Sequence, residues 1–338
     1  MTSFFQIIKT SFHDFWNWNR SGKTPTIAYV AMRKLFVLTN GRSNDFLSRL
    51  ISFKKKKYTD IISTGVLGDL TPELTCKIAE KLERDGMYIF ENELDEKTVR
   101  AIEEFARKEP ASYLMVESKP KVKYSDNKIN VDTEKPVSPR YEYGFEQIMK
   151  CKELESLVFD QSILAVAQEY LKCSPVLDLV AFWWSLPYEG KGKSEAAQMY
   201  HFDMDRIKFI KFFFYVTDVD TDTGPHCYVK GSNKRLPPAL LKDGRIEDAE
   251  IEKAFSKNNM IEICGKKGTI MAVDTRGLHK GKPLNKGYRL LFQIEMANSM
   301  FGQYYAPVTI NSLNPHYQNI VKTYKRTYSQ IFNFPFLK

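Results

Sequence analysis

The chain has 338 residues, 43% hydrophobic and 27% charged. This composition is ordinary for a globular protein and excludes a wholly disordered or collagen-like chain. The formal net charge is +9, and all of it lies in residues 1–57, which carry 11 Lys/Arg and two Asp/Glu; the rest of the chain holds 39 of each sign. A neutral body therefore follows a basic leader. Because the body has no basic excess and no recognisable reader motif, we expect no nucleic-acid partner.

The cysteines and the apolar runs predict the compartment. Five cysteines are scattered without a CxxC pair, so neither a disulfide framework nor a zinc ribbon is indicated. Apolar runs such as Ile27–Met32 and Phe212–Val216 are far shorter than the roughly 20 residues that cross a bilayer. We therefore expect a cytoplasmic protein, with membrane-peripheral placement as the alternative.

The leader has two interpretations. Aromatic residues recur at helical spacing over residues 1–18, and Asp45 is a candidate cap for a second short helix before Lys54–Lys57. Such a basic, aromatic segment can lie on an anionic membrane or contact an acidic partner. The simpler interpretation, which we favour, is that these helices pack against the body. We divide the chain into a leader, 1–57, and a catalytic domain, 58–338.

The body begins with helices and ends with strands. Capping residues and periodicity predict helices over 71–86, 95–108, 145–157 and 160–172, a strand over Met87–Phe90 and a long loop over 117–143. Seven strand-like runs follow Pro175: Val176–Leu186, Gln198–Asp203, Ile207–Val219, His226–Val229, Met260–Cys264, Thr269–Val273 and Tyr288–Met296. This order predicts an α+β fold with a β-sandwich or jelly-roll core over about 176–297.

Two histidines and one aspartate in this half suggest a metal site. His201 and Asp203, in HFDMD, are two residues apart, so on a strand both side chains leave the same face. His279, in GLHKGKP, follows a predicted strand and is the candidate third ligand. Two imidazoles and one carboxylate form the facial triad of non-haem Fe(II) oxygenases. The alternatives are a structural strand histidine at His201 and Asp205 in place of Asp203.

Arg289 strengthens this hypothesis. It lies ten residues after His279 on the next predicted strand, where it shares a face with Leu291 and Gln293. A planar guanidinium can hold a carboxylate in a bidentate grip. The alternative is an arginine that faces the surface. For two further residues we favour a structural interpretation: His226 as a turn histidine, with a place in the pocket as the alternative, and Trp183 as a core aromatic, with a place in an apolar substrate wall as the alternative.

Taken together, HFDMD, TGPHCYVKGSN, GTIMAVDTRGLHKGKP and YRLLFQ resemble the phytanoyl-CoA dioxygenase family of Fe(II)/2-oxoglutarate oxygenases, over about Thr71 to Ala297. The resemblance implies a double-stranded β-helix (jelly-roll, cupin-like) core with flanking helices. It also implies that His201, Asp203 and His279 bind Fe(II) and that Arg289 binds the distal carboxylate of 2-oxoglutarate. Some members place a serine where this chain has Gly281, so a second cosubstrate contact is left open.

The expected activity is a dioxygenase that uses Fe(II), 2-oxoglutarate and O2, hydroxylates a small or lipid-like molecule and releases succinate and CO2. One alternative is a metal-dependent jelly-roll enzyme that does not use 2-oxoglutarate. The other is a non-catalytic binding protein that retains the fold. The sequence indicates neither the substrate nor the oligomeric state.

Overall fold

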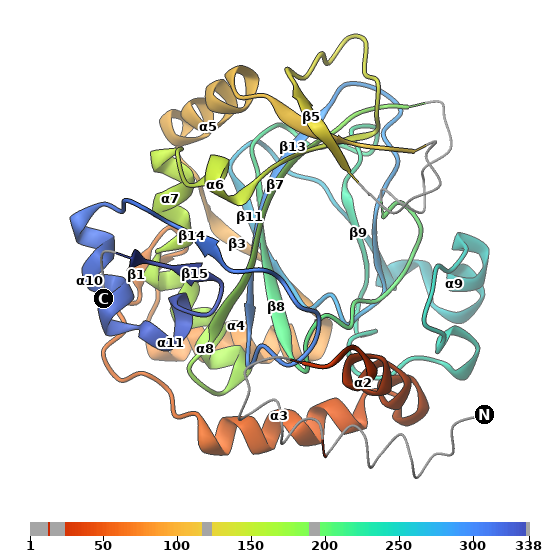
Figure 1. Cartoon of the computed structure of the whole chain (residues 1–338). Helices are drawn as coiled ribbons and strands as arrows, with labels where there is room; N and C mark the ends of the chain where they lie inside the picture. Colours follow the sequence, from red (N-terminus) through yellow and green to blue (C-terminus); the bar gives the residue numbers. More distant parts are fainter. Residues whose placement is uncertain (1–12, 14–23, 117–123, 189–196, 336–338) are drawn as a thin grey trace.

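The computed structural model describes residues 13, 24–116, 124–188 and 197–335, in which two antiparallel sheets face each other (Figure 1). The large sheet has eight strands in the order β3 (Met87–Glu93), β11 (Thr269–Val273), β8 (Phe209–Tyr215), β13 (Arg289–Ala297), β7 (Val176–Ser185), β6 (Arg140–Tyr143), β4 (Ala111–Leu114) and β5 (Tyr124–Ile129). The small sheet has the order β10 (Met260–Ile263), β9 (His226–Val229) and β12 (His279–Gly281). Two short pairs complete the strands: β1 (Thr64–Gly65) with β2 (Gly68–Asp69), and β14 (Val308–Thr309) with β15 (Phe332–Asn333). The predicted α+β fold with a jelly-roll core is confirmed.

Most helices lie behind the large sheet, whereas α9 lies beside the small one (Figure 1). The α-helices are α2 (Thr26–Thr39), α3 (Arg42–Lys54), α4 (Pro72–Asp85), α5 (Glu96–Lys108), α6 (Phe145–Ile148), α7 (Lys152–Val158), α8 (Gln161–Leu171), α9 (Asp248–Ala254), α10 (Pro315–Thr323) and α11 (Lys325–Tyr328). Two 3-10 turns are η1 (Pro238–Leu240) and η2 (Lys257–Asn259). Among the described residues, none of the helices has both the length and the apolarity to span a membrane.

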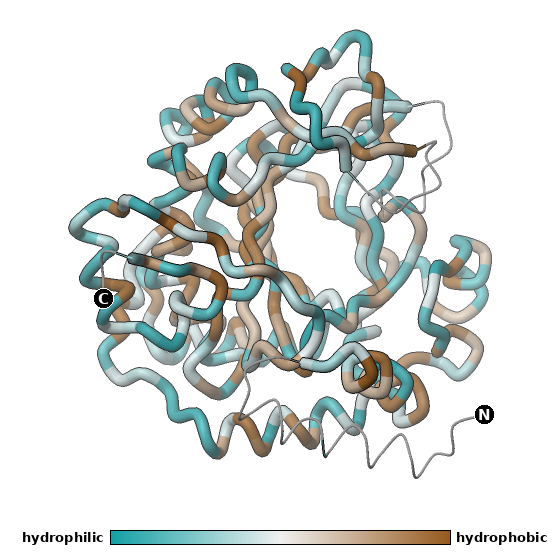
Figure 2. Tube along the Cα trace, viewed as in Figure 1, coloured by the Kyte–Doolittle hydropathy of each residue, from teal (hydrophilic) through white to brown (hydrophobic). Residues whose placement is uncertain are grey.

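Strand β13 shows how the sheet separates core from cavity. All nine of its residues are buried, although only every second one is consistently apolar. Leu290, Phe292 and Ile294 face the helices and belong to the main hydrophobic core, which appears in Figure 2 as the apolar stretches along the large sheet. Arg289 and Gln293 alternate with them and line a cavity between the sheets. Because side chains alternate along a strand, β13 builds the core with one face and the site with the other.

Two local predictions are wrong. The segment Gln198–Asp203 is not a strand, because only isolated bridges form there, at Tyr200 and His201. The predicted loop over 117–143 contains β5 and β6, which extend the large sheet; residues 117–123 lie outside the described part of the chain. The sequence did not indicate β5 because this strand is half-exposed and carries the polar residues Asp126, Asn127 and Lys128.

Helices α2 and α3 of the leader pack against the body. Leu47 and Ile51 belong to the main core, and Asn44 Nδ2 donates a hydrogen bond to the carbonyl of Ile207, 3.2 Å away. Asp45 does not cap α3, because the helix begins after Gly41; it lies in the first turn instead. The helix predicted over residues 1–18 lies outside the described residues, apart from residue 13.

Candidate active site

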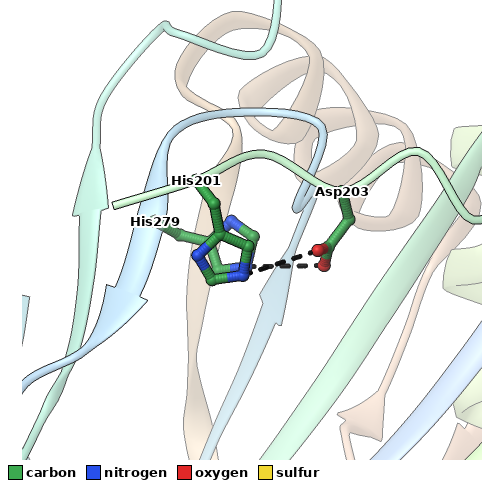
Figure 3. Close-up of side chains that lie close together, drawn as sticks. All are labelled: His201, Asp203 and His279. Carbon is green, nitrogen blue, oxygen red and sulfur yellow. Dashed lines mark ion pairs between the residues drawn. The ribbon is translucent and has the colours of Figure 1, made fainter. Parts of the chain in front are cut away.

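His201, Asp203 and His279 converge on one point between the sheets (Figure 3). Backbone hydrogen bonds of 3.0 and 2.9 Å join His201 to His279 in both directions, and the Asp203 N–H donates to the carbonyl of Thr275 at 2.8 Å. The Nε2 atoms of His201 and His279 lie 3.6 and 3.4 Å from the Asp203 carboxylate oxygens. Potential ligand atoms from the three side chains all lie within 4.8 Å of one another. Although the HFDMD segment is not a strand, the bridge to β12 brings its side chains to this point.

The hydrogen bonds of the two histidines determine which nitrogen faces the centre. His201 Nδ1 lies 2.9 Å from the carbonyl of Met199, and His279 Nδ1 lies 3.0 Å from the carbonyl of Gly277. Because a carbonyl only accepts, each Nδ1 carries a proton and each Nε2 is the nitrogen that can present a lone pair to a metal at the centre. Burial, followed by the neighbouring His279, lowers the pKa of His201 to about 3, so this ring is neutral.

The carboxylate of Asp203 is held ionised. Burial opposes its ionisation, but the ammonium of Lys211 keeps its pKa well below the usual range. Lys211 Nζ lies 2.7 Å from Asp203 Oδ2. Asp205, the alternative ligand, lies 3.7 Å from Lys211 and is not one of the three converging groups. The donor set is therefore two imidazole Nε2 atoms and one carboxylate, which suits Fe(II) and leaves coordination positions open.

Arg289 lies in the same cavity, whose volume is about 420 Å³. Its side chain is 6% exposed, which rules out the surface-facing alternative. Nη1 donates to the carbonyl of Gly224 and Nη2 to Ser185 Oγ at 3.1 Å, whereas Nε is buried without a partner. Within the described part of the chain no carboxylate forms an ion pair with this guanidinium. An anionic ligand in the cavity would satisfy it.

With this geometry established, the family can be assigned. The sequence model of the family "Phytanoyl-CoA dioxygenase (PhyH)" matches residues 82–290. The chain belongs to the phytanoyl-CoA dioxygenase family. It is therefore an oxidoreductase of the Fe(II)- and 2-oxoglutarate-dependent dioxygenase type, as predicted.

Comparison with solved structures gives more distant similarities. The chain is 18% identical to AviO1 from Streptomyces viridochromogenes Tue57; the match covers 66% of this chain and 94% of that one, and the TM-score is 0.44. It is 14% identical to EctD from S. alaskensis, solved with 2-oxoglutarate and 5-hydroxyectoine, covering 72% and 83% with a TM-score of 0.49. It is 15% identical to the α-ketoglutarate-dependent carbocyclase SnoK from nogalamycin biosynthesis, covering 69% and 84% with a TM-score of 0.47. No curated protein matches the chain.

In this dioxygenase, His226 lines the cavity, so its interpretation as a turn histidine is wrong. It begins β9, and its ring lies 5.5 Å from that of His279 at an interplanar angle of 21°. Burial, then the nearby His279 and Arg289, keep the pKa of His226 well below its usual value. The alternation in His226–Val229 could have indicated this, because His226 then shares a face with the interior residue Tyr228.

Lys211 is a residue of the site that the sequence did not single out. It lies on β8 among apolar neighbours, and all residues of that strand are buried. A lysine within such an apolar run is itself a signal, because a buried ammonium needs an anionic partner. Its nearest partner is Asp203, 2.7 Å away, whereas Glu295, 3.4 Å from Lys211 Nζ, comes from β13 and could not be named from the sequence.

The aromatic residues near the site divide between two environments. Trp183 lines the cavity, whereas its neighbour Trp184 faces the helices and donates to Tyr143 Oη at 2.8 Å. Tyr200 packs in a separate cluster. The lysine-containing loop over 190–195 lies outside the described residues.

Proposed function

We propose that His201, Asp203 and His279 bind Fe(II) and that Arg289 binds the distal carboxylate of 2-oxoglutarate. The observation that carries this proposal is the buried Arg289 Nε, which has no partner among the described residues and lies in the same cavity as the converging imidazoles and carboxylate. A cosubstrate with carboxylates at both ends can reach the metal with one end and the guanidinium with the other.

The bound iron would supply the O2 chemistry that couples oxidative decarboxylation of 2-oxoglutarate, giving succinate and CO2, to oxidation of the substrate. The protein supplies geometry. The backbone carbonyls of Met199 and Gly277 orient the two imidazoles, and Lys211 holds the Asp203 carboxylate. Arg289 fixes the cosubstrate, and the apolar part of the lining, which includes Phe213 and Leu291, restricts water. Since the third ligand is a carboxylate rather than a small side chain, the donor set supports hydroxylation over halogenation.

We propose a compact, polar small-molecule substrate in preference to a lipid-like one. The cavity has to hold both cosubstrate and substrate in about 420 Å³. The lining beyond the metal-binding side chains includes Gln293, Gln303 and Tyr305, as well as Trp183, whose Nε1 is buried without a partner. These groups are better suited to hydrogen bonding than to packing against a hydrocarbon chain.

The remaining proposals concern organisation and location. The division into residues 1–57 and 58–338 is kept as a functional boundary, because the converging side chains and Arg289 all lie in the second part. Cytoplasmic placement is proposed from the scattered cysteines, which are all unpaired. Docking to an anionic membrane or an acidic partner is proposed only for the basic leader.

Anaerobic titration of the protein with Fe(II) and 2-oxoglutarate tests the site. The wild type should develop the weak visible charge-transfer band of a 2-oxo acid chelated to Fe(II), and the double variant H201A/D203A should not. A missing band in the wild type, or a band that survives in the double variant, contradicts the assignment. Succinate release during turnover separates this function from a jelly-roll enzyme that uses no 2-oxoglutarate and from a non-catalytic protein.

A further inference from the structure

His226 is held firmly in the wall of the cavity. It opens β9, where it pairs with Ile263 of β10 on one side and Gly281 of β12 on the other. Its backbone N–H donates to Tyr215 Oη at 3.1 Å. The imidazole lies between two rings, with centroids 5.0 Å from that of Phe213 and 5.5 Å from that of His279. The position and plane of this ring are therefore set by the fold.

Among the described residues, the Nε2 atom of this ring has no hydrogen-bond partner. His226 is 6% exposed, and its Nε2 is buried without a hydrogen bond. Buried polar atoms are nearly always satisfied, and those that are not commonly belong to a ligand site. The flanking ring of Phe213 offers no hydrogen-bonding atom. The missing partner is therefore expected from the cavity that His226 lines.

The surroundings of His226 show which molecule that partner belongs to. The ring of His279, a proposed iron ligand, stacks on that of His226. Arg289 is also nearby, because it donates to the carbonyl of Gly224, two residues before His226. Gly281, the strand partner of His226, is also close to this guanidinium: a Cβ built there would lie 3.4 Å from Arg289 Nη2. His226 therefore lies beside the path that a molecule must follow to join the iron ligands to Arg289.

We propose that His226 Nε2–H donates a hydrogen bond to 2-oxoglutarate at its 2-oxo acid end, next to the iron. This inference rests on the proposed function and adds a second cosubstrate contact, supplied from β9 because Gly281 has no side chain to offer. The oxygens of the 2-oxo acid end only accept hydrogen bonds, so the proton is on Nε2. The ring has little freedom to turn, so this contact orients the chelating end rather than merely attracting it.

The test compares two 2-oxo acids in anaerobic titrations of Fe(II)-loaded protein, followed by the charge-transfer band. One is 2-oxoglutarate; the other is 2-oxobutyrate, which keeps the chelating end but lacks the distal carboxylate. The substitution His226→Phe keeps a flat ring against His279 and removes the N–H, whereas His226→Gln keeps an N–H donor.

For H226F we expect the Kd of both acids to rise by a similar factor, on the order of tenfold, and the band maximum to shift. H226Q should recover part of the affinity for both. R289A should raise the Kd of 2-oxoglutarate alone. Fe(II) affinity measured without a 2-oxo acid should be the same in H226F as in the wild type.

Three results would overturn the inference: unchanged Kd values and band in H226F, a rise for 2-oxoglutarate alone, or an equal loss of Fe(II) affinity. If H226F does not fold, His226→Leu removes the same N–H and is judged by the same criteria. A wild-type protein that gives no band with 2-oxoglutarate contradicts the proposed function instead, so the two failures are distinguishable.

Discussion

Lys211 forms an ion pair with Asp203 beneath the candidate iron site, with Nζ 2.7 Å from Oδ2. The same ammonium lies 3.4 Å from Glu295 and 3.7 Å from Asp205, so one buried cation faces three carboxyl groups, and burial raises the pKa of Glu295 well above its ordinary value. Burial lowers the pKa of Lys211, but these carboxylates reverse the effect and hold it well above the ordinary value. The metal-free site therefore depends on Lys211 for its electrostatic balance.

Replacing this lysine should make folding depend on the metal. In Lys211→Met the carboxylates lose their cation, and we expect metal-free protein to lose about 3–5 kcal/mol of unfolding free energy. Added Fe(II), or Mn(II) in air, should restore more stability in the variant than in the wild type, since a divalent cation compensates the same charges. Thermal unfolding with and without metal measures this. Lys253→Met on the exposed face of α9 is the matched control, and an equal metal-induced shift in K211M and wild type would contradict the prediction.

Arg289 should contribute to cosubstrate binding and not to metal binding. Removing a bidentate hydrogen-bonding partner of a carboxylate costs about 1.5–3 kcal/mol, so Arg289→Ala should raise the Kd of 2-oxoglutarate by at least tenfold. Arg289→Lys should recover only part of this because an ammonium cannot form the forked contact. Calorimetric titration of 2-oxoglutarate into Mn(II)-loaded protein measures the cosubstrate affinity, and titration of Mn(II) into metal-free protein measures the metal affinity. Arg100→Ala on exposed α5 is the control, and parallel losses of metal and cosubstrate affinity would count against the assigned role.

The loop before His279 is stabilised by a buried ion pair whose effect depends on pH. Asp274 accepts hydrogen bonds from Tyr170 and Arg276. Burial raises the pKa of Asp274, but Arg276 and Tyr170 outweigh this and hold it below the usual value. Because the folded-state pKa is lowered, the pair stabilises the protein above the unfolded-state pKa of about 4 and loses this contribution as the pH falls below it.

Asp274→Asn should therefore cost about 3–5 kcal/mol at pH 7, since it leaves the Arg276 guanidinium buried without its carboxylate. The difference from wild type should shrink progressively below pH 4. Urea unfolding at several pH values measures it, with Asp69→Asn as an exposed control. A cost that does not change with pH would mean that packing, rather than charge, explains the effect.

Helix α3 provides a test of whether the leader is part of the fold. Leu47 is 3% exposed in the main core, whereas Phe53 on the same helix is 87% exposed. Leu47→Ala should reduce the unfolding free energy by about 2–5 kcal/mol, and Phe53→Ala should change it little. Chemical unfolding compares the two. If L47A is as mild as F53A, the leader contributes little to folding and the docking interpretation gains weight.

The sequence predicted correctly the features that depend on residues close together in the chain. Alternation predicted the two faces of β13, and the spacing of His201 and Asp203 suggested that both point to one place. It was uninformative where the relevant neighbour comes from a distant strand. Nothing near Lys211 in the sequence identifies Glu295, because the two meet only through the pairing of β8 with β13. The segment around His201 shows a further limit: its side chains converge through a bridge to His279, although it does not form the predicted strand.

One face of β13 builds the core and the other lines the cavity, and this arrangement restricts the sequence changes that the enzyme can tolerate. A one-residue insertion or deletion in the strand would turn Leu290 and Phe292 toward the cavity and bury Arg289 and Gln293 in the apolar core. Length changes there would destroy the fold and the chemistry together. New substrate preferences in such a scaffold must arise by point substitution at inward positions such as Leu291 and Gln293, or from the loops around the rim. Within this strand, substitutions that change substrate preference are therefore expected only at inward positions other than Arg289.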